Sequence, residues 1–123
     1  MIIKNKITNL EKMFYNCNSL AKINGLNLLD TKDIKNFSYM FYGCSALSEI
    51  ESLEDWNVSN GNDFSYMFDG CKSLLEITPL KNWIVSKGND FSYMFHNCSS
   101  LSDVKTIFHI CSVIAPHYQI LIL

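Results

Sequence analysis

The dipeptide Met-Phe recurs along this chain at a constant interval of 27 residues, and no other feature limits the possible folds as strongly. The four copies are Met13-Phe14, Met40-Phe41, Met67-Phe68 and Met94-Phe95. A cysteine follows three residues after each Phe, which gives Cys17, Cys44, Cys71 and Cys98. Further apolar positions keep the same register, beginning with Leu20, Leu47, Leu74 and Leu101. A period of this length predicts an array of similar units that stack on one another.

The register divides a single domain, residues 1–123, into four units. The units are residues 7–33, 34–60, 61–87 and 88–114, followed by an apolar tail at 115–123. One unit offers about eight large apolar side chains, worth ~1.5–3 kcal/mol each when buried. Ordering its backbone costs ~1–2 kcal/mol per residue, which is the larger sum. A single unit therefore cannot fold alone, and its stability must come from contacts with neighbouring units.

The two terminal units each leave one face uncovered. We expect them to be the least stable part of the array and the place where copies of the chain self-associate. The end of the tail, residues 118–123, has two interpretations. It folds over the last unit as a lid, or it is an unprotected apolar strand that pairs with another chain.

Local sequence patterns predict one short helix and one short strand in each unit. Residues 63–71 have the pattern of a helix, because Asp63 is a residue type that caps helix N-termini and Gly70 one that ends helices. Residues 47–53 have the pattern of a strand centred on Ile50. The equivalent strands are centred on Ile23, Ile77 and Val104. The predicted fold is an α/β solenoid, a leucine-rich-repeat coil of four 27-residue units with short parallel strands on one face and short helices on the other.

Two segments resemble the repeat of a known family. They are residues 37–47, FSYMFYGCSAL, and residues 56–60, WNVSN, with further copies at Phe64 and Phe91. These residues are similar to the BspA-like leucine-rich-repeat proteins, in particular the type described from mycoplasma surface proteins. The resemblance covers residues 7–104 and implies display at the cell surface or secretion, with adhesion or ligand binding as the function.

The sequence departs from the pattern of that family in three places. Gly61 and Gly88 stand where a β-branched residue is usual. The first unit lacks the Trp, and the last unit loses the turn pattern after Ile107. The last departure puts a complete C-terminal cap in doubt.

The cysteines and histidines do not form a chemical site in the sequence. Single cysteines in successive units are expected to form an inward column, in which a thiol packs as a small apolar group. The total of five is odd, with Cys111 outside the column, so we expect free thiols. The histidines His96, His109 and His117 have no repeated partner. No nucleophile motif, metal-ligand spacing or phosphate loop occurs, and we expect no catalytic residue, no metal site, no cofactor and no enzymatic activity.

The predicted strands carry acidic residues on their outer side, because side chains alternate along a strand. One repeat position holds Glu49, Glu76 and Asp103, and the position two residues later holds Glu51, Thr78 and Lys105. Lys22 marks one end of this face. Like charges on neighbouring strands ~4.8 Å apart destabilise each other. One interpretation is a column of charges that is solvated and screened. The other is a binding face for a basic protein segment or a cation.

Composition and charge exclude several classes of function. The net charge is −2 and the ten basic residues are scattered, so we expect no nucleic-acid surface. Residues 1–9 lack a secretory signal, and the apolar stretch at 113–123 is interrupted and too short for membrane insertion. We expect a non-catalytic protein-interaction or adhesion module that binds a protein ligand through the strand face. The alternative is an intracellular scaffold, or a fragment of a longer repeat array without a separate activity.

Overall fold

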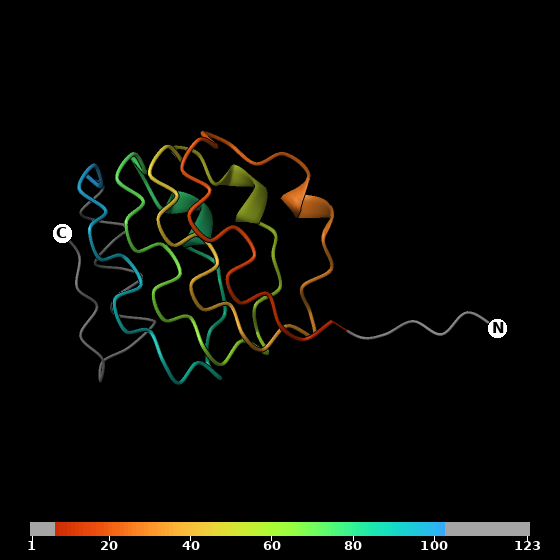
Figure 1. Ribbon diagram of the computed structural model, residues 1–123. Helices are drawn as coiled ribbons and strands as arrows, with labels where there is room; N and C mark the ends of the chain where they lie inside the picture. Colours follow the sequence, from red (N-terminus) through yellow and green to blue (C-terminus); the bar gives the residue numbers. More distant parts are fainter. Residues whose placement is uncertain (1–6, 103–123) are drawn as a thin grey trace.

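The computed structural model describes residues 7–102, and there each 27-residue unit forms one coil that lies beside the next (Figure 1). We call residues 7–33, 34–60 and 61–87 the first, second and third coils, and residues 88–102 the fourth. Three isolated parallel bridges join Asn9 with Asn36, Asn36 with Asp63, and Asp63 with Asp90. Because bridged residues are 27 positions apart, the sequence register is also the stacking register of the coils.

Within the described residues, regular secondary structure is limited to one short 3₁₀ helix in each of the first three coils. The helices are η1 (Leu26–Leu28), η2 (Glu51–Leu53) and η3 (Thr78–Leu80). Between residues 7 and 102 there is no β-strand and no longer helix. The predicted leucine-rich-repeat α/β solenoid, with strands on one face and helices on the other, is therefore wrong.

The predicted helix at 63–71, with its copies, is instead a run of turns that binds the next coil. In the second coil, the N–H groups of four alternate residues donate to carbonyl oxygens of the third coil at 2.8–3.0 Å. These donors are Phe37, Tyr39, Phe41 and Gly43. Between them, the N–H of Tyr42 closes a turn on the carbonyl of Tyr39 at 3.2 Å. An α-helix capped at Asn36 would need the N–H groups of Phe41, Tyr42 and Gly43 for bonds to carbonyls four residues back, so the two arrangements exclude each other.

Left-handed residues shape the run of turns. Gly43 has a φ of 72°, and its copies Asn16, Gly70 and Asn97 also have positive φ. Glycine and asparagine are the residue types that best tolerate this conformation. Tyr39, at 56°, is left-handed as well, together with its copies Lys12, Tyr66 and Tyr93. Bulky residues rarely adopt positive φ, and a right-handed helix cannot pass through one that does.

The residues predicted to cap the helices bind backbone N–H groups, but in another motif. The Oδ1 of Asn36 accepts a hydrogen bond from the N–H of Ser38 at 2.8 Å, and that of Asp63 accepts one from Ser65 at 2.9 Å. A side-chain oxygen bonded to the N–H two residues later forms an Asx turn. An Asx turn can precede either an α-helix or a run of turns. The capping residues therefore do not show which of these two structures follows them.

The predicted strands, centred on Ile50 and its copies, are also absent within residues 7–102. Ile50 has φ −129° and ψ 26°, outside the extended region, and the backbone then tightens into η2. The inward direction of these isoleucines is nevertheless as predicted, with Ile50 3% and Ile77 0% exposed. The strand predicted at Val104 lies outside the described residues.

Columns of apolar side chains run through the coils and form the core. The Met-Phe dipeptides of the second, third and fourth coils are at most 1% exposed. The ring of Phe68 stacks between those of Phe41 and Phe95, with centroids 5.3 and 5.6 Å away. Trp56 and Trp83 are also buried, and each Nε1 donates to a backbone carbonyl of the preceding coil, at 2.7 and 3.0 Å. These residues therefore form the core of the stack.

The first coil is much less buried than the others. Met13 is 47% exposed and Leu20 is 39% exposed, whereas their copies Met40 and Leu47 are 0% and 1% exposed. The open face expected at a terminal unit is therefore present at this end. The tail at 115–123 and the end of the last unit lie outside the described residues.

Candidate functional site

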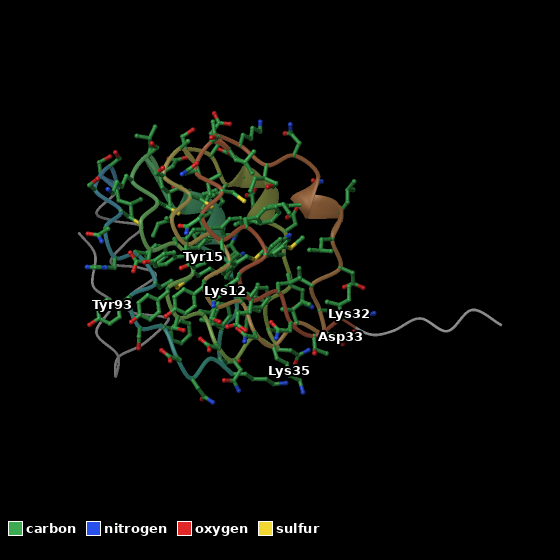
Figure 2. The ribbon with its side chains drawn as sticks, in the orientation of Figure 1. Lys12, Tyr15, Lys32, Asp33, Lys35 and Tyr93 are labelled. Carbon is green, nitrogen blue, oxygen red and sulfur yellow. The ribbon has the colours of Figure 1, made fainter. Side chains whose placement is uncertain are left out.

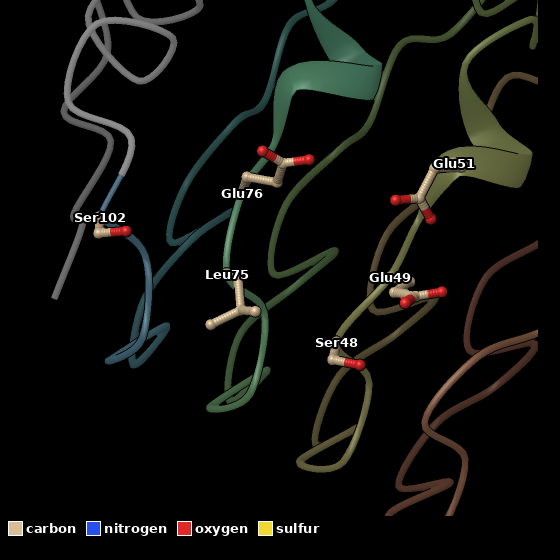
Figure 3. A pocket seen from close by; sticks show the side chains of 6 residues that line it. All are labelled: Ser48, Glu49, Glu51, Leu75, Glu76 and Ser102. Atoms are coloured by element: carbon tan, nitrogen blue, oxygen red, sulfur yellow. The ribbon is translucent and has the colours of Figure 1, made fainter.

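The acidic residues predicted to bind a ligand surround a shallow hollow that crosses the second, third and fourth coils (Figure 3). We call it the acidic hollow. Its volume is about 420 Å³, and its lining residues are Ser48, Glu49, Glu51, Leu75, Glu76 and Ser102. Three of the predicted binding residues, Glu49, Glu51 and Glu76, are thus brought together at one site.

Buried isoleucines set the direction of these acidic side chains. Ile50 and Ile77 point into the core, and Glu49, Glu51 and Glu76 beside them are exposed. The outward direction predicted from strand alternation is correct, although no strand forms. Glu51 begins η2, so a 3₁₀ turn positions its carboxylate instead.

The hollow carries more negative charge than positive charge. The Nζ of Lys22 lies 3.5 Å from Oε2 of Glu49, with the two side chains 55% and 52% exposed. An ion pair this exposed contributes little to stability. Glu51 and Glu76 form no ion pair with any residue of the described part of the chain. Two carboxylates therefore remain for a positively charged ligand.

The remaining predicted residues are placed differently. Thr78 lies in η3 and does not line the hollow. Asp103 and Lys105 lie outside the described residues. Leu75, which is 58% exposed, lines the hollow but was not predicted. It stands at the repeat position that holds serine in the second and fourth coils, and this break in the repeat was its only signal in the sequence.

A second surface, not predicted from the sequence, is a column of stacked tyrosines. The ring of Tyr39 lies 4.6 Å from that of Tyr66, which in turn lies 5.0 Å from that of Tyr93. Lys12, at the same repeat position in the first coil, places its Nζ 5.7 Å from the centroid of Tyr39, within cation–π range. Figure 2 labels the two ends of this column, Lys12 and Tyr93. The 27-residue spacing of the tyrosines was the signal that could have revealed it.

The chemistry of the tyrosine column is limited by its own stacking. Burial, followed by the neighbouring tyrosines, raises the pKa of Tyr39, so its hydroxyl stays neutral at physiological pH. Stacked rings cover each other's faces, and only ring edges and hydroxyls remain for a ligand. Beside the column, Nδ1 of His96 lies 3.3 Å from Oδ2 of the buried Asp69. We interpret the tyrosine column mainly as a structural feature that keeps neighbouring coils in register.

Comparison with known families identifies the repeat. A family model described as "Mycoplasma protein of unknown function, DUF285" matches residues 5–118. The chain belongs to this family. No curated protein and no solved structure matches it. In this DUF285 protein, the match includes both the acidic hollow and the tyrosine column.

The cysteines of the DUF285 protein form the inward column predicted from the repeat. Cys44, Cys71 and Cys98 are buried, Cys17 is half-buried, and all four are free thiols. The Sγ of Cys44 donates to the carbonyl of Phe14 at 3.1 Å, and the two later thiols make the same bond one coil on. Burial raises the pKa of Cys44 to about 11 and that of Cys98 to about 12, and it raises the pKa of Cys71 as well.

These differences predict selective alkylation of Cys17 in the folded protein. The thiolate is the reactive form, and burial suppresses it in the other three cysteines of the column. We expect Cys44, Cys71 and Cys98 to react at least about tenfold more slowly than Cys17 with iodoacetamide near about pH 8. Peptide mass spectrometry after brief labelling measures this in a Cys111→Ser background, with urea-unfolded protein as the control. Equal rates for Cys71 and Cys17 in the folded protein would contradict the prediction.

Other site types find no support among the described residues. Between residues 7 and 102, no three His, Cys, Asp or Glu side chains lie close enough together to hold a metal ion. In the same range, no helix has the length and apolar character needed to cross a membrane.

Proposed function

We propose that this DUF285 protein is a non-catalytic protein-interaction module that binds a basic segment of a protein ligand in the acidic hollow. The observation that supports this most directly is the presence of three exposed carboxylates around one hollow, of which only Glu49 has an ion pair with another residue of the range 7–102. Exposed Leu75 lies among them. A lysine or arginine side chain matches this combination, because its aliphatic stem packs on an apolar residue while its charge meets a carboxylate.

A basic segment fits the hollow better than a metal ion does. Ca²⁺ needs six to eight oxygen ligands that converge on one point. The three carboxylates are instead spread over two coils, and no group of three among the described residues is close enough for a metal ion. An extended segment with several positive charges can reach separate carboxylates along the stack.

We further propose that the ligand lies outside the cell. The similarity of residues 37–47 and their copies to BspA-like repeats of mycoplasma surface proteins supports surface adhesion. The second candidate is an intracellular scaffold, or a fragment of a longer repeat array without a separate activity. The exposed face of the first coil favours a longer array, because internal units of an array have both faces covered. Surface labelling of intact cells with a reagent that cannot enter them separates the surface role from the intracellular scaffold, since only a displayed protein is labelled.

Binding of an oligolysine peptide tests the proposed site. We expect the Glu51→Gln/Glu76→Gln variant to bind the labelled peptide about tenfold more weakly than the unmodified protein in fluorescence anisotropy, since both unpaired carboxylates are lost. The matched control, Glu54→Gln/Asp55→Asn, removes the same charge from exposed residues that do not line the hollow. Its Kd should stay within about threefold of the original value. Equal weakening in both variants would show non-specific attraction and would remove the proposal.

A further inference from the structure

The hydrogen bonds between coils run in one direction through the run of turns. In the first coil, the N–H groups of Leu10, Lys12, Phe14 and Asn16 donate to carbonyl oxygens of the second coil at 2.6–3.1 Å. The second coil donates to the third, and the third to the fourth, from equivalent residues. In this segment, each coil therefore offers N–H groups to the coil after it and carbonyl oxygens to the coil before it.

The outer edge of the first coil carries a row of carbonyl oxygens that receive no N–H from residues 7–102. The accepting carbonyls of the second coil belong to Asn36, Ser38, Met40 and Tyr42. Their counterparts in the first coil are the carbonyls of Asn9, Glu11, Met13 and Tyr15. No N–H of residues 7–102 donates to these four oxygens. In the second, third and fourth coils the equivalent carbonyls accept N–H groups of the preceding coil. In the first coil they are left without an N–H from residues 7–102.

Exposed apolar side chains gather on the same coil. The large apolar residues with more than a third of their surface exposed include five in the first coil: Ile7, Met13, Tyr15, Leu20 and Leu28. The ring of Phe14 stacks on Phe41 at 5.6 Å and is half-buried, whereas Phe41 is stacked on both sides and 1% exposed. The later coils contact each other through N–H to carbonyl hydrogen bonds and through packed apolar side chains. At the outer edge of the first coil, residues 7–102 provide neither kind of contact.

Because the row of carbonyls presents acceptors and no N–H donors, only some kinds of partner can bind to it. A β-strand presents the N–H and the C=O of the same residue to the same side, so it would place a carbonyl against part of the row. A second copy of the first coil would place one carbonyl row against another. A partner fits only if it directs the N–H groups of alternate residues to one side, which the left-handed residues Tyr39 and Gly43 achieve in the second coil.

We propose that the outer edge of the first coil is a docking site for a further coil of the same 27-residue repeat. The docked coil donates its N–H row to the carbonyls of Glu11, Met13 and Tyr15, and it stacks a phenylalanine on Phe14. A carbonyl of that coil accepts the Cys17 thiol, as the carbonyl of Phe14 accepts the Cys44 thiol. This surface is independent of the acidic hollow, and either can fail without the other.

A tethered coil tests the docking site in the full chain. The probe is a copy of residues 34–60 inserted between residues 6 and 7, where the tether keeps its effective concentration high. We expect alkylation of Cys17 to slow by about tenfold or more, because its thiol becomes buried. We also expect a higher Tm, because docking adds a coil-to-coil interface. The Cys17 peptide is distinct from the inserted sequence, so mass spectrometry follows it separately.

The control insert carries Tyr39→Val and Gly43→Val in the inserted copy only. Valine disfavours the left-handed conformation, so this insert keeps most apolar residues but cannot direct its N–H groups in one row. Cys17 should then react as fast as in the unmodified protein. The proposal is overturned if the first insert leaves the Cys17 rate and the Tm unchanged. It is also overturned if the valine insert protects Cys17 equally, because apolar cover alone would then explain the effect.

Discussion

Replacement of Phe68 by alanine is expected to lower the free energy of unfolding by about 3–5 kcal/mol, the range for a large ring removed from a packed core. Phe68 is 0% exposed and lies between two other rings, those of Phe41 and Phe95. Each coil is stabilised mainly by its neighbours, so a cavity in the third coil weakens two interfaces at once. Urea unfolding followed by the fluorescence of Trp56 and Trp83 measures the loss.

The same substitution at Phe14 provides the control within the same column. Phe14 is half-buried, and among the rings of residues 7–102 it stacks on one only, that of Phe41. We expect Phe14→Ala to cost less than about 2 kcal/mol, because less buried surface is lost and the open edge leaves no closed cavity. Equal losses at both positions would contradict the conclusion that the first coil is open.

The register and the core could be predicted because both depend on which side chains face inward. Burial of Met67, Phe68 and Cys71 follows from a repeat that returns the same residue types to the same place in every coil. The repeat does not reveal how the backbone between these residues is bonded. A correct core was therefore compatible with the wrong secondary structure.

The helix at 63–71 was mispredicted because its start and stop signals do not belong to helices alone. Asp63 and Gly70 act as expected, one as a side-chain acceptor and the other as a left-handed residue. What decides against the helix is the left-handed Tyr66, whose N–H donates to the carbonyl of Ser92 at 2.9 Å. That bond joins residues 26 positions apart, and local sequence patterns do not contain such information.

The acidic hollow was partly predictable for the same reason as the core. Glu49, Glu51 and Glu76 lie next to isoleucines whose inward direction the repeat fixes, so their outward direction follows. The exposed Leu75 breaks the repeat pattern and was missed. The stacked tyrosines were missed although Tyr39, Tyr66 and Tyr93 follow the 27-residue spacing, because the sequence did not indicate the positive φ of these residues.

Gly61 and Gly88, which depart from the usual family pattern, have a physical explanation in the structure. A Cβ atom built on Gly61 would lie 2.3 Å from Cζ of Phe64, and one on Gly88 would lie 2.2 Å from Cζ of Phe91. Both distances are far shorter than a normal contact between carbon atoms. The second coil has Ile34 at this position, and that side chain is 1% exposed. The second coil buries both Ile34 and a phenylalanine, Phe37, at the two equivalent positions. In the third and fourth coils the ring lies where the side chain beside it would begin, so only glycine fits there.

Gly61→Val is therefore expected to destabilise the protein by about 1–3 kcal/mol or more, because it overpacks a filled site. The φ of Gly61 is not in the left-handed region, so the cost comes from the ring of Phe64 and not from backbone strain. Phe64→Leu alone should also destabilise, since Phe64 is 0% exposed and stacked on both Phe37 and Phe91. In the double variant, the smaller leucine makes room for the valine, and the total loss should be smaller than the sum of the single losses by about 1 kcal/mol. Urea unfolding of the four proteins measures this coupling. Losses that add within about 0.5 kcal/mol would show that the ring does not occupy the missing side chain's place.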